Sequence, residues 1–161
     1  MKAKIEYQPI GVIRTPFKKR EGMPIQPSGA DGVQGMVDVF DEYNDGLSDL
    51  EGFSHIILLY HFHQSKGSPL RVTPFMDSQP RGVFSTRAPK RPNPIGISVV
   101  KLMKVEESIL HVENVDMIDG TPLLDIKPNV PEFDHYAVNR IGWLERTRNG
   151  IRDKRSDNRF K

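Results

Sequence analysis

The chain has 161 residues, a length that suits one domain with a buried core. It contains no cysteine, so disulfides, zinc–thiolate sites and cysteine nucleophiles are excluded. No apolar run approaches the roughly 18–20 residues that cross a bilayer, and the N-terminus lacks the apolar core of a signal peptide. We therefore expect a cytoplasmic protein without a membrane segment.

The formal net charge is +2, but the charge is unevenly distributed. The segment 140–161 has three acidic residues against eight basic ones, namely Arg140, Arg146, Arg148, Arg152, Lys154, Arg155, Arg159 and Lys161. A basic tail favours a polyanionic partner, most often nucleic acid, and the alternative is a solvated charged surface.

In chain order, Glu6–Arg14 is expected to form the first strand, with Pro9 placing its start at a sheet edge. Met23–Gly32 contains two prolines and two glycines without helical periodicity, which indicates a binding loop or a disordered segment. Val33–Phe40 alternates as a strand does. The acidic, turn-rich segment Asp41–Gly52 follows, with a short helical turn expected around Leu47 and Leu50.

The most apolar run, Phe53–Gln64, is expected to be a central strand. Strand alternation divides its side chains between two faces. One face carries Ser54, Ile56, Leu58, Tyr60, Phe62 and Gln64, and the other carries His55, Ile57, Leu59, His61 and His63. Three histidines on one face are either core side chains or part of a metal site that would need a further ligand from elsewhere.

Ser65–Pro80 reads as a loop, and Ile95–Val105 as a strand that forms a hairpin with Ser108–Val115. An acidic turn beginning at Asp116 then leads into a last strand that ends near Pro128. Many short strands, frequent proline and glycine, and almost no amphipathic helix predict an all-β barrel or sandwich.

We expect two parts: a β-barrel domain over residues 1–132 and a short basic C-terminal extension over 133–161. The extension is expected to be partly helical, around Val138–Thr147, or flexible.

The stretch Arg81–Lys104 combines positive charge with stiffness. No acidic residue occurs from Ser78 through Val105, and three prolines restrain the backbone. The cations are Arg81, Arg87, Lys90 and Arg91, and the prolines are Pro89, Pro92 and Pro94. This long, Pro-rich basic loop is typical of a rigid cationic pocket wall, with a solvated basic loop as the alternative.

Two further groups carry candidate chemistry. Asp116, Asp119 and Asp125 lie close together around a Gly-Thr-Pro turn and offer carboxylates to hydroxyls or amines, or else cap the turn. Asn93 is locked between two prolines, where its amide could read a base edge or an exocyclic amine. The chain has no G-x-G-x-x-G turn after a strand, no P-loop and no G-x-S-x-G elbow.

The string GVFSTRAPKRPNPIGIS, from Gly82 to Ser98, resembles the signature of the TsaA/TrmO-like family of S-adenosylmethionine-dependent tRNA methyltransferases. The resemblance covers most of the chain. It includes IGVIRTPF from Ile10, IQPS from Ile25, LEGFSH from Leu50, FHQ from Phe62 and DGTPLLDIKP from Asp119.

This resemblance implies a small, non-Rossmann β-barrel that forms a homodimer and binds S-adenosyl-L-methionine near the subunit interface. It implies methylation of N6 of N6-threonylcarbamoyladenosine at position 37, in the anticodon loop of a threonine tRNA, with no metal required. By matching motifs, the cofactor site would comprise Gln26, Pro27, Ser28, His63, Gln64, Arg87, Ile97, Val115 and Asp116.

For the substrate side, the resemblance makes Lys90, Arg91 and Asn93 candidates for contacts, with Asn93 also a catalytic candidate. An N6 nitrogen needs a group that removes its proton, and we assign this to Asp116 or Asp119. Arg87 and Arg91 would hold the threonylcarbamoyl carboxylate or phosphates.

Longer family members carry an additional C-terminal domain, so the basic tail is the expected substitute surface for tRNA. The rival hypotheses are a non-catalytic single-strand RNA-binding barrel and a metal hydrolase that uses His55, His61 and His63.

Overall fold

The computed structural model describes residues 3–147 and 150–160. Its centre is a closed barrel of six strands in the order β1-β2-β7-β6-β3-β8, and all neighbouring strands are antiparallel. The strands are β1 (Gly11–Arg14), β2 (Gln34–Val39), β3 (His55–His61), β6 (Ile95–Glu106), β7 (Ile109–Glu113) and β8 (Thr121–Pro128). The expectation of an all-β barrel is confirmed.

Alternation along the strands builds the core. In β6 the residues at 96, 98, 100 and 102 are buried, whereas those at 95, 97, 99 and 101 are exposed. In β3, Ile56, Leu58 and Tyr60 point into the barrel, as the sequence pattern predicts, and each is at most 5% exposed. Closing the sheet removes its edges, so each strand is paired on both sides.

The connections contain short elements. The 3₁₀ helices are η1 (Pro27–Gly29), η2 (Asp41–Leu47), η3 (Leu50–Gly52), η4 (Val83–Ser85), η5 (Gly142–Arg146) and η7 (Asn158–Phe160). The short α1 (Pro131–Asp134) follows β8, and β4 (Arg71–Val72) pairs with β5 (Arg81–Gly82) as a separate ribbon. The turns expected around Leu47 and Leu50 are confirmed by η2 and η3.

Several elements are shorter than expected; β3, for example, covers only His55–His61 of the expected Phe53–Gln64. The first strand begins at Gly11 and not at Glu6, because Pro9 has no N–H for the ladder and residues 3–9 are exposed. The helix expected over Val138–Thr147 is a single 3₁₀ segment, η5, and residues 135–140 have no regular structure.

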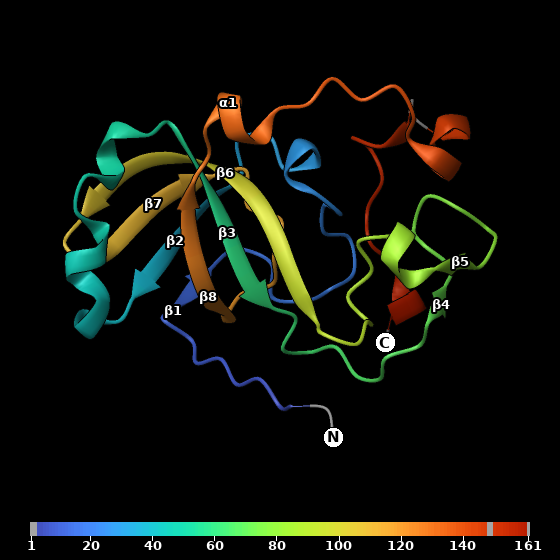
Figure 1. Cartoon of the computed structure of the whole chain (residues 1–161), viewed down its shortest axis with the longest axis horizontal. Helices are drawn as coiled ribbons and strands as arrows, with labels where there is room; N and C mark the ends of the chain where they lie inside the picture. The colour runs from blue at the N-terminus through green and yellow to red at the C-terminus, as the bar shows by residue number, and fades with distance from the viewer. Residues whose placement is uncertain (1–2, 148–149, 161) are drawn as a thin grey trace.

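Beyond α1 the chain folds back across the β4–β5 ribbon (Figure 1). Phe160 enters a small hydrophobic cluster with Val72, Val83 and Ala88, separate from the barrel core, and its ring meets Phe75 edge to face at 5.1 Å. Backbone bonds join Ser156 to the segment around Met23. The extension is therefore packed against the rest of the protein, and the domain boundary at residue 132 stays a prediction.

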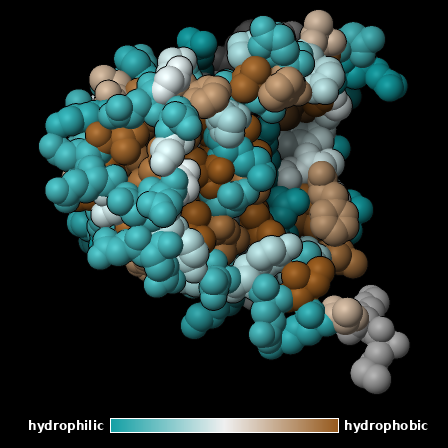
Figure 2. All heavy atoms as spheres, turned by 60° about the vertical axis from the view of Figure 1, so that its left-hand side comes forward, coloured by the Kyte–Doolittle hydropathy of each residue, from teal (hydrophilic) through white to brown (hydrophobic). Residues whose placement is uncertain are grey.

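A pocket of about 560 Å³, here called the acidic pocket, lies beside η2 and η3. Its charged side chains are Glu42, Asp49 and Asp125, and its apolar wall includes Leu47 and Phe53. Figure 2 brings this side of the molecule forward and shows hydrophobic atoms gathered among hydrophilic ones. None of the helices formed by the described residues has the length and apolar character needed to span a bilayer.

Candidate functional site

A larger pocket of about 710 Å³, here called the cationic pocket, lies between the barrel and the folded-back extension. Six parts of the chain form it: residues 20–27, the end of β3 with 62–65, residues 74–76, the segment 84–97, the turn 116–121, and residues 143–144 with 156–160. Its charged or ionisable side chains are Arg20, His63, Arg87, Arg91, Asp116 and Asp157.

Asp116 is the half-buried carboxylate of the cationic pocket. Its Oδ1 accepts a hydrogen bond of 2.6 Å from Ser98, which itself is only 2% exposed. Burial raises the pKa of Asp116 to about 7, although the Ser98 hydrogen bond and the Arg87 charge act in the opposite direction. A carboxylate with a pKa near neutrality can accept a proton at physiological pH and release it again.

Tyr60 lies behind Asp116 in the barrel interior. Its hydroxyl is 3.0 Å from Ser98 Oγ, and burial raises its pKa so that the phenol stays protonated. Gly96 faces Tyr60 in the β3–β6 register, and a Cβ at Gly96 would come within 2.2 Å of the Tyr60 ring. Only glycine leaves room for the ring at this position.

The basic side chains of the pocket differ in their surroundings. Arg87 is exposed and close enough to influence the pKa of Asp116. Arg91 is half-buried and donates to the carbonyls of Thr86 and Ala88, so it also fastens its own loop. Desolvation and the neighbouring His61 lower the pKa of His63, so His63 is neutral at pH 7.

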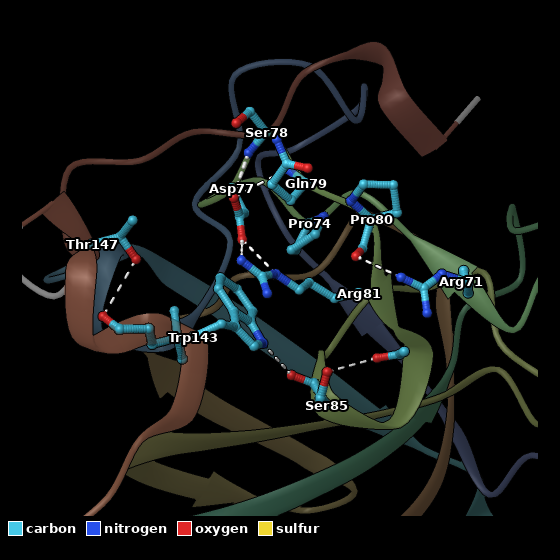
Figure 3. A network of polar contacts seen from close by, with 12 residues as sticks. Arg71, Pro74, Asp77, Ser78, Gln79, Pro80, Arg81, Ser85, Trp143 and Thr147 are labelled. Atoms are coloured by element: carbon cyan, nitrogen blue, oxygen red, sulfur yellow. Dashed lines mark hydrogen bonds and ion pairs between the residues drawn. The ribbon is translucent and has the colours of Figure 1, made fainter.

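A network of polar contacts stiffens the wall between the basic loop and the extension (Figure 3). Arg81 forms an ion pair of 2.6 Å with Asp77, and its guanidinium lies 5.9 Å from the centre of the Trp143 ring. The Trp143 indole N–H donates to the carbonyl of Ser85 at 2.9 Å. Residues from the extension and the signature loop thus hold one another in place.

Ser65 supplies an unused polar group. Its hydroxyl is buried and is the one buried side-chain polar atom without a hydrogen-bond partner in the described part of the chain. Because Ser65 also lines the cationic pocket, a bound polar ligand could complete its hydrogen bonding.

Most residues singled out from the sequence meet in this pocket. Those that line it are Gln26, Pro27, His63, Gln64, Arg87, Arg91, Ile97 and Asp116. Ser28, Lys90, Asn93, Val115 and Asp119 do not line it. Val115 is fully buried beneath the turn, and Ser28 and Asn93 are exposed outside the pocket.

Asp119 differs from Asp116 although it belongs to the same turn. It accepts hydrogen bonds from the backbone N–H of Thr15 at 3.0 Å and from Lys18 at 2.6 Å. The Lys18 contact is the largest of the causes that lower the pKa of Asp119. A strongly acidic, paired carboxylate outside the pocket is a poor proton acceptor, so the geometry favours Asp116 over Asp119.

The histidines do not form a cluster. His55 and His61 are at opposite ends of β3, about 20 Å apart at the usual rise of a strand. Within residues 3–147 and 150–160, no group of three or more His, Cys, Asp or Glu side chains is placed to hold a metal ion. The metal-hydrolase hypothesis therefore has no ligand set there.

Sequence reasoning missed Tyr60, Ser65, Ser98 and Trp143 as pocket residues or their support. One signal was available: Ser98 falls on the inward face of β6, between Gly96 and Val100, where a polar side chain is unexpected. The contribution of Trp143 had no such signal, because it depends on how the extension folds back.

A model of the tRNA-methyltransferase O N-terminal domain matches residues 12–135. A probable S-adenosyl-L-methionine-binding protein of Pyrococcus abyssi is 54% identical over 154 residues, covering 96% of this chain and 84% of the relative.

The tRNA (adenine(37)-N6)-methyltransferase of Escherichia coli is 40% identical over 136 residues, covering 78% of this chain. The crystal structure of TrmO from Pseudomonas aeruginosa superposes with a TM-score of 0.74 at 38% identity, covering 88% of this chain. The matches span 58% of the Escherichia coli enzyme and 63% of the Pseudomonas chain.

Proposed function

Because the chain belongs to the family defined by the tRNA-methyltransferase O N-terminal domain, we propose that it transfers a methyl group from S-adenosyl-L-methionine to N6 of an adenosine in tRNA. The finer proposal is N6-threonylcarbamoyladenosine at position 37 of a threonine tRNA. The observation that carries it is a half-buried carboxylate, Asp116, set among arginines in a pocket of about 710 Å³.

The residues of the cationic pocket fit S-adenosyl-L-methionine. The volume lies within the range of cofactor sites, and the lining mixes apolar surface with a few polar groups. Ser65 has a hydroxyl in need of a partner, and Gln26 and Gln64 offer amides. These side chains would hold the cofactor, which when bound supplies an electrophilic methyl group.

The protein's own task is to prepare the nucleophile. N6 of the substrate is weakly basic, because its lone pair is delocalised into the ring and the carbamoyl group, and its proton must leave. Asp116 would accept that proton through a carboxylate oxygen. The pocket walls from the extension, including Trp143 and Phe160, would exclude water from the site.

The arginines support the finer substrate assignment. A threonylcarbamoyl group carries a carboxylate, which a guanidinium binds through paired hydrogen bonds. Arg87 and Arg91 line the same pocket as Asp116, so one substrate can reach all three. Lys90 and Asn93 are outside the pocket, where they would contact the flanking RNA.

We include a homodimer in the proposal, for a reason found on β6. Its outward face carries Ile95, Ile97, Val99 and Met103, each 38–48% exposed. This apolar row continues into the cationic pocket through Ile95 and Ile97, so a second copy packed on β6 would border the site. We also propose the cytoplasmic location expected from the sequence, because the proposed substrate is a tRNA.

The test is methylation of defined tRNAs followed by mass spectrometry of the nucleosides. Three threonine tRNAs are compared, with N6-threonylcarbamoyladenosine, unmodified adenosine or guanosine at position 37. We expect a methyl group on the threonylcarbamoyladenosine only. Transfer to unmodified adenosine would retain the reaction and refute the finer substrate, whereas binding of RNA without any transfer would favour the non-catalytic alternative. Size-exclusion chromatography with light scattering tests the dimer.

A further inference from the structure

Two polar side chains inside the barrel, Tyr60 and Ser98, form a line of hydrogen bonds that ends at Asp116. Ser98 Oγ donates to Asp116 Oδ1 at 2.6 Å, and the Tyr60 hydroxyl lies 3.0 Å from Ser98 Oγ. Ser98 has only one hydrogen and gives it to the carboxylate, so Tyr60 must be the donor to Ser98. The hydrogen bonds therefore run from Tyr60 through Ser98 to the pocket.

This direction favours the ionised form of Asp116. If Asp116 were protonated and donated to Ser98, the hydrogen of either Ser98 or Tyr60 would lack an acceptor among the described hydrogen bonds. Tyr60 is 5% exposed and Ser98 is 2% exposed, so water offers little replacement. The hydrogen bonds from Tyr60 and Ser98 therefore stabilise the ionised form of Asp116, whereas burial stabilises its neutral form.

The barrel is built to accommodate this line. Gly96 admits the Tyr60 ring, and Ser98 occupies the next inward position of β6. A hydroxyl in the core costs stability relative to an apolar side chain unless it has a partner. The β6 sequence keeps both the glycine and the serine, at the one place where they serve Asp116.

Other charged groups also act on Asp116. The Arg87 charge lowers its pKa, from the segment after η4. The remaining ionisable side chains that line the pocket are Arg20, His63, Arg91 and Asp157. Ser98 is distinct from all of these because it alone donates a hydrogen bond from a side chain to the carboxylate in the described structure.

We propose that Ser98, oriented by Tyr60, is the positioning residue of Asp116. Ser98 fixes Oδ1, which presents Oδ2 to the N6–H of the substrate. The proton moves from N6 to Asp116 Oδ2, and neither Ser98 nor Tyr60 gives up its own proton. This inference rests on the proposed function, in which Asp116 is the proton acceptor.

The kinetic test uses Ser98→Ala and Tyr60→Phe, which remove one oxygen each and leave the packing nearly unchanged. Without the Ser98 donor, the acidic limb of the kcat profile moves to higher pH by about one unit, and kcat at pH 6 falls about tenfold. The KM for S-adenosyl-L-methionine stays near the wild-type value. Tyr60→Phe produces a smaller shift, and the double variant resembles Ser98→Ala, because Tyr60 acts through Ser98.

A second measurement is independent of activity. Carbon-13 NMR of aspartate-labelled protein follows the titration of Asp116, with Asp116→Asn used to assign its signal. We expect the pKa of Asp116 to rise in Ser98→Ala and, by less, in Tyr60→Phe. An unchanged titration in Ser98→Ala overturns the inference, whether or not the protein methylates tRNA.

The control is Thr15→Val, which also removes a buried hydroxyl. Thr15 donates to the carbonyl of Met117 and makes none of the described hydrogen bonds to Asp116, so its loss should lower stability without moving the acidic limb. An equal shift in Thr15→Val would show a general effect of destabilisation and overturn the role of Ser98. If wild-type protein transfers no methyl group, the proposed function fails, and the NMR titration still decides on Ser98.

Discussion

The cationic and acidic pockets are of similar size, about 710 and 560 Å³, but present opposite charges. The cationic pocket surrounds one half-buried carboxylate with arginines and a neutral histidine. The acidic pocket has three carboxylate side chains, Glu42, Asp49 and Asp125, and no Lys or Arg among its lining residues. A polyanionic substrate would be attracted to the first and repelled by the second.

The pockets also differ in how they are built. The acidic pocket is lined by η2, η3, the residue before β1, the end of β2 and part of β8. The cationic pocket is lined by six segments, some of them far apart in sequence. We therefore expect the cationic pocket, which distant segments build together, to be the functional one. Matched substitutions in the two pockets test this expectation.

The largest effect is expected for Asp116→Asn. Loss of the proton acceptor should lower kcat by about 10²- to 10⁴-fold, with the KM for S-adenosyl-L-methionine little changed. The matched control in the acidic pocket is Asp125→Asn, which should keep wild-type turnover. The measurement is steady-state methylation of tRNA. Equal losses in both variants would contradict the distinction between the pockets.

The next effect is expected for Arg87→Ala. Removing the guanidinium beside Asp116 should lower kcat/KM for tRNA by about 10- to 100-fold, since a charge-assisted contact is lost. Arg87→Lys should recover part of it, because lysine keeps the charge but not the paired donors. Lys127→Ala, next to the acidic pocket through its ion pair with Asp125, serves as the control. Wild-type kinetics in Arg87→Ala would remove this residue from the substrate site.

Burial of Asp116 in the cationic pocket should lower the free energy of unfolding at high pH. The pKa of Asp116 is raised to about 7, so the folded state binds its proton more tightly than the unfolded chain does. Its stabilising contribution is complete below pH 4 and is lost as the pH rises through 7. Asp116→Asn should therefore be more stable than wild type at pH 8 by about 1–3 kcal/mol, and the gap should close towards pH 5. Urea unfolding at several pH values measures this, and a gap that does not vary with pH would contradict it.

The smallest effect concerns Ser65. If its free hydroxyl completes its hydrogen bonding with the cofactor, Ser65→Ala should weaken S-adenosyl-L-methionine binding by about 3- to 10-fold in calorimetry. Ser48→Ala removes a hydroxyl from the acidic pocket, where Ser48 already donates to Asp45, and should leave this affinity unchanged. Unaltered binding in Ser65→Ala would leave Ser65 as an unsatisfied group without a role.

The sequence predicted the barrel well because its evidence is local. The alternation in β3 placed Ile56, Leu58 and Tyr60 on the inward face, and the hairpin between β6 and β7 was read from the strands on either side of it. The family resemblance, taken motif by motif, named eight residues that line the cationic pocket. These are properties of short stretches, so they can be predicted without knowledge of the whole fold.

What sequence could not resolve depends on contacts between distant segments. Asp116 and Asp119 are three residues apart and equally acidic in sequence. Their environments differ through the deeper burial of Asp116 and through contacts with distant residues, Ser98 for Asp116 and Lys18 for Asp119. The basic tail was expected to be a surface for tRNA. Arg159 forms an ion pair with Asp157 and donates to the carbonyl of Pro74, and Arg148 and Lys161 lie outside the described residues, so this expectation stays a prediction.

The small cluster around Phe160 is separate from the barrel core, and we expect it to unfold as a second cooperative unit. It contains four buried side chains, against fifteen in the barrel core, so it should open at a much lower free energy than the barrel. Amide hydrogens at Met23 and Ser156 should then exchange with solvent sooner than those of β3. A cofactor bound between the two units would bind only when both are folded, and it would slow exchange at these amides most.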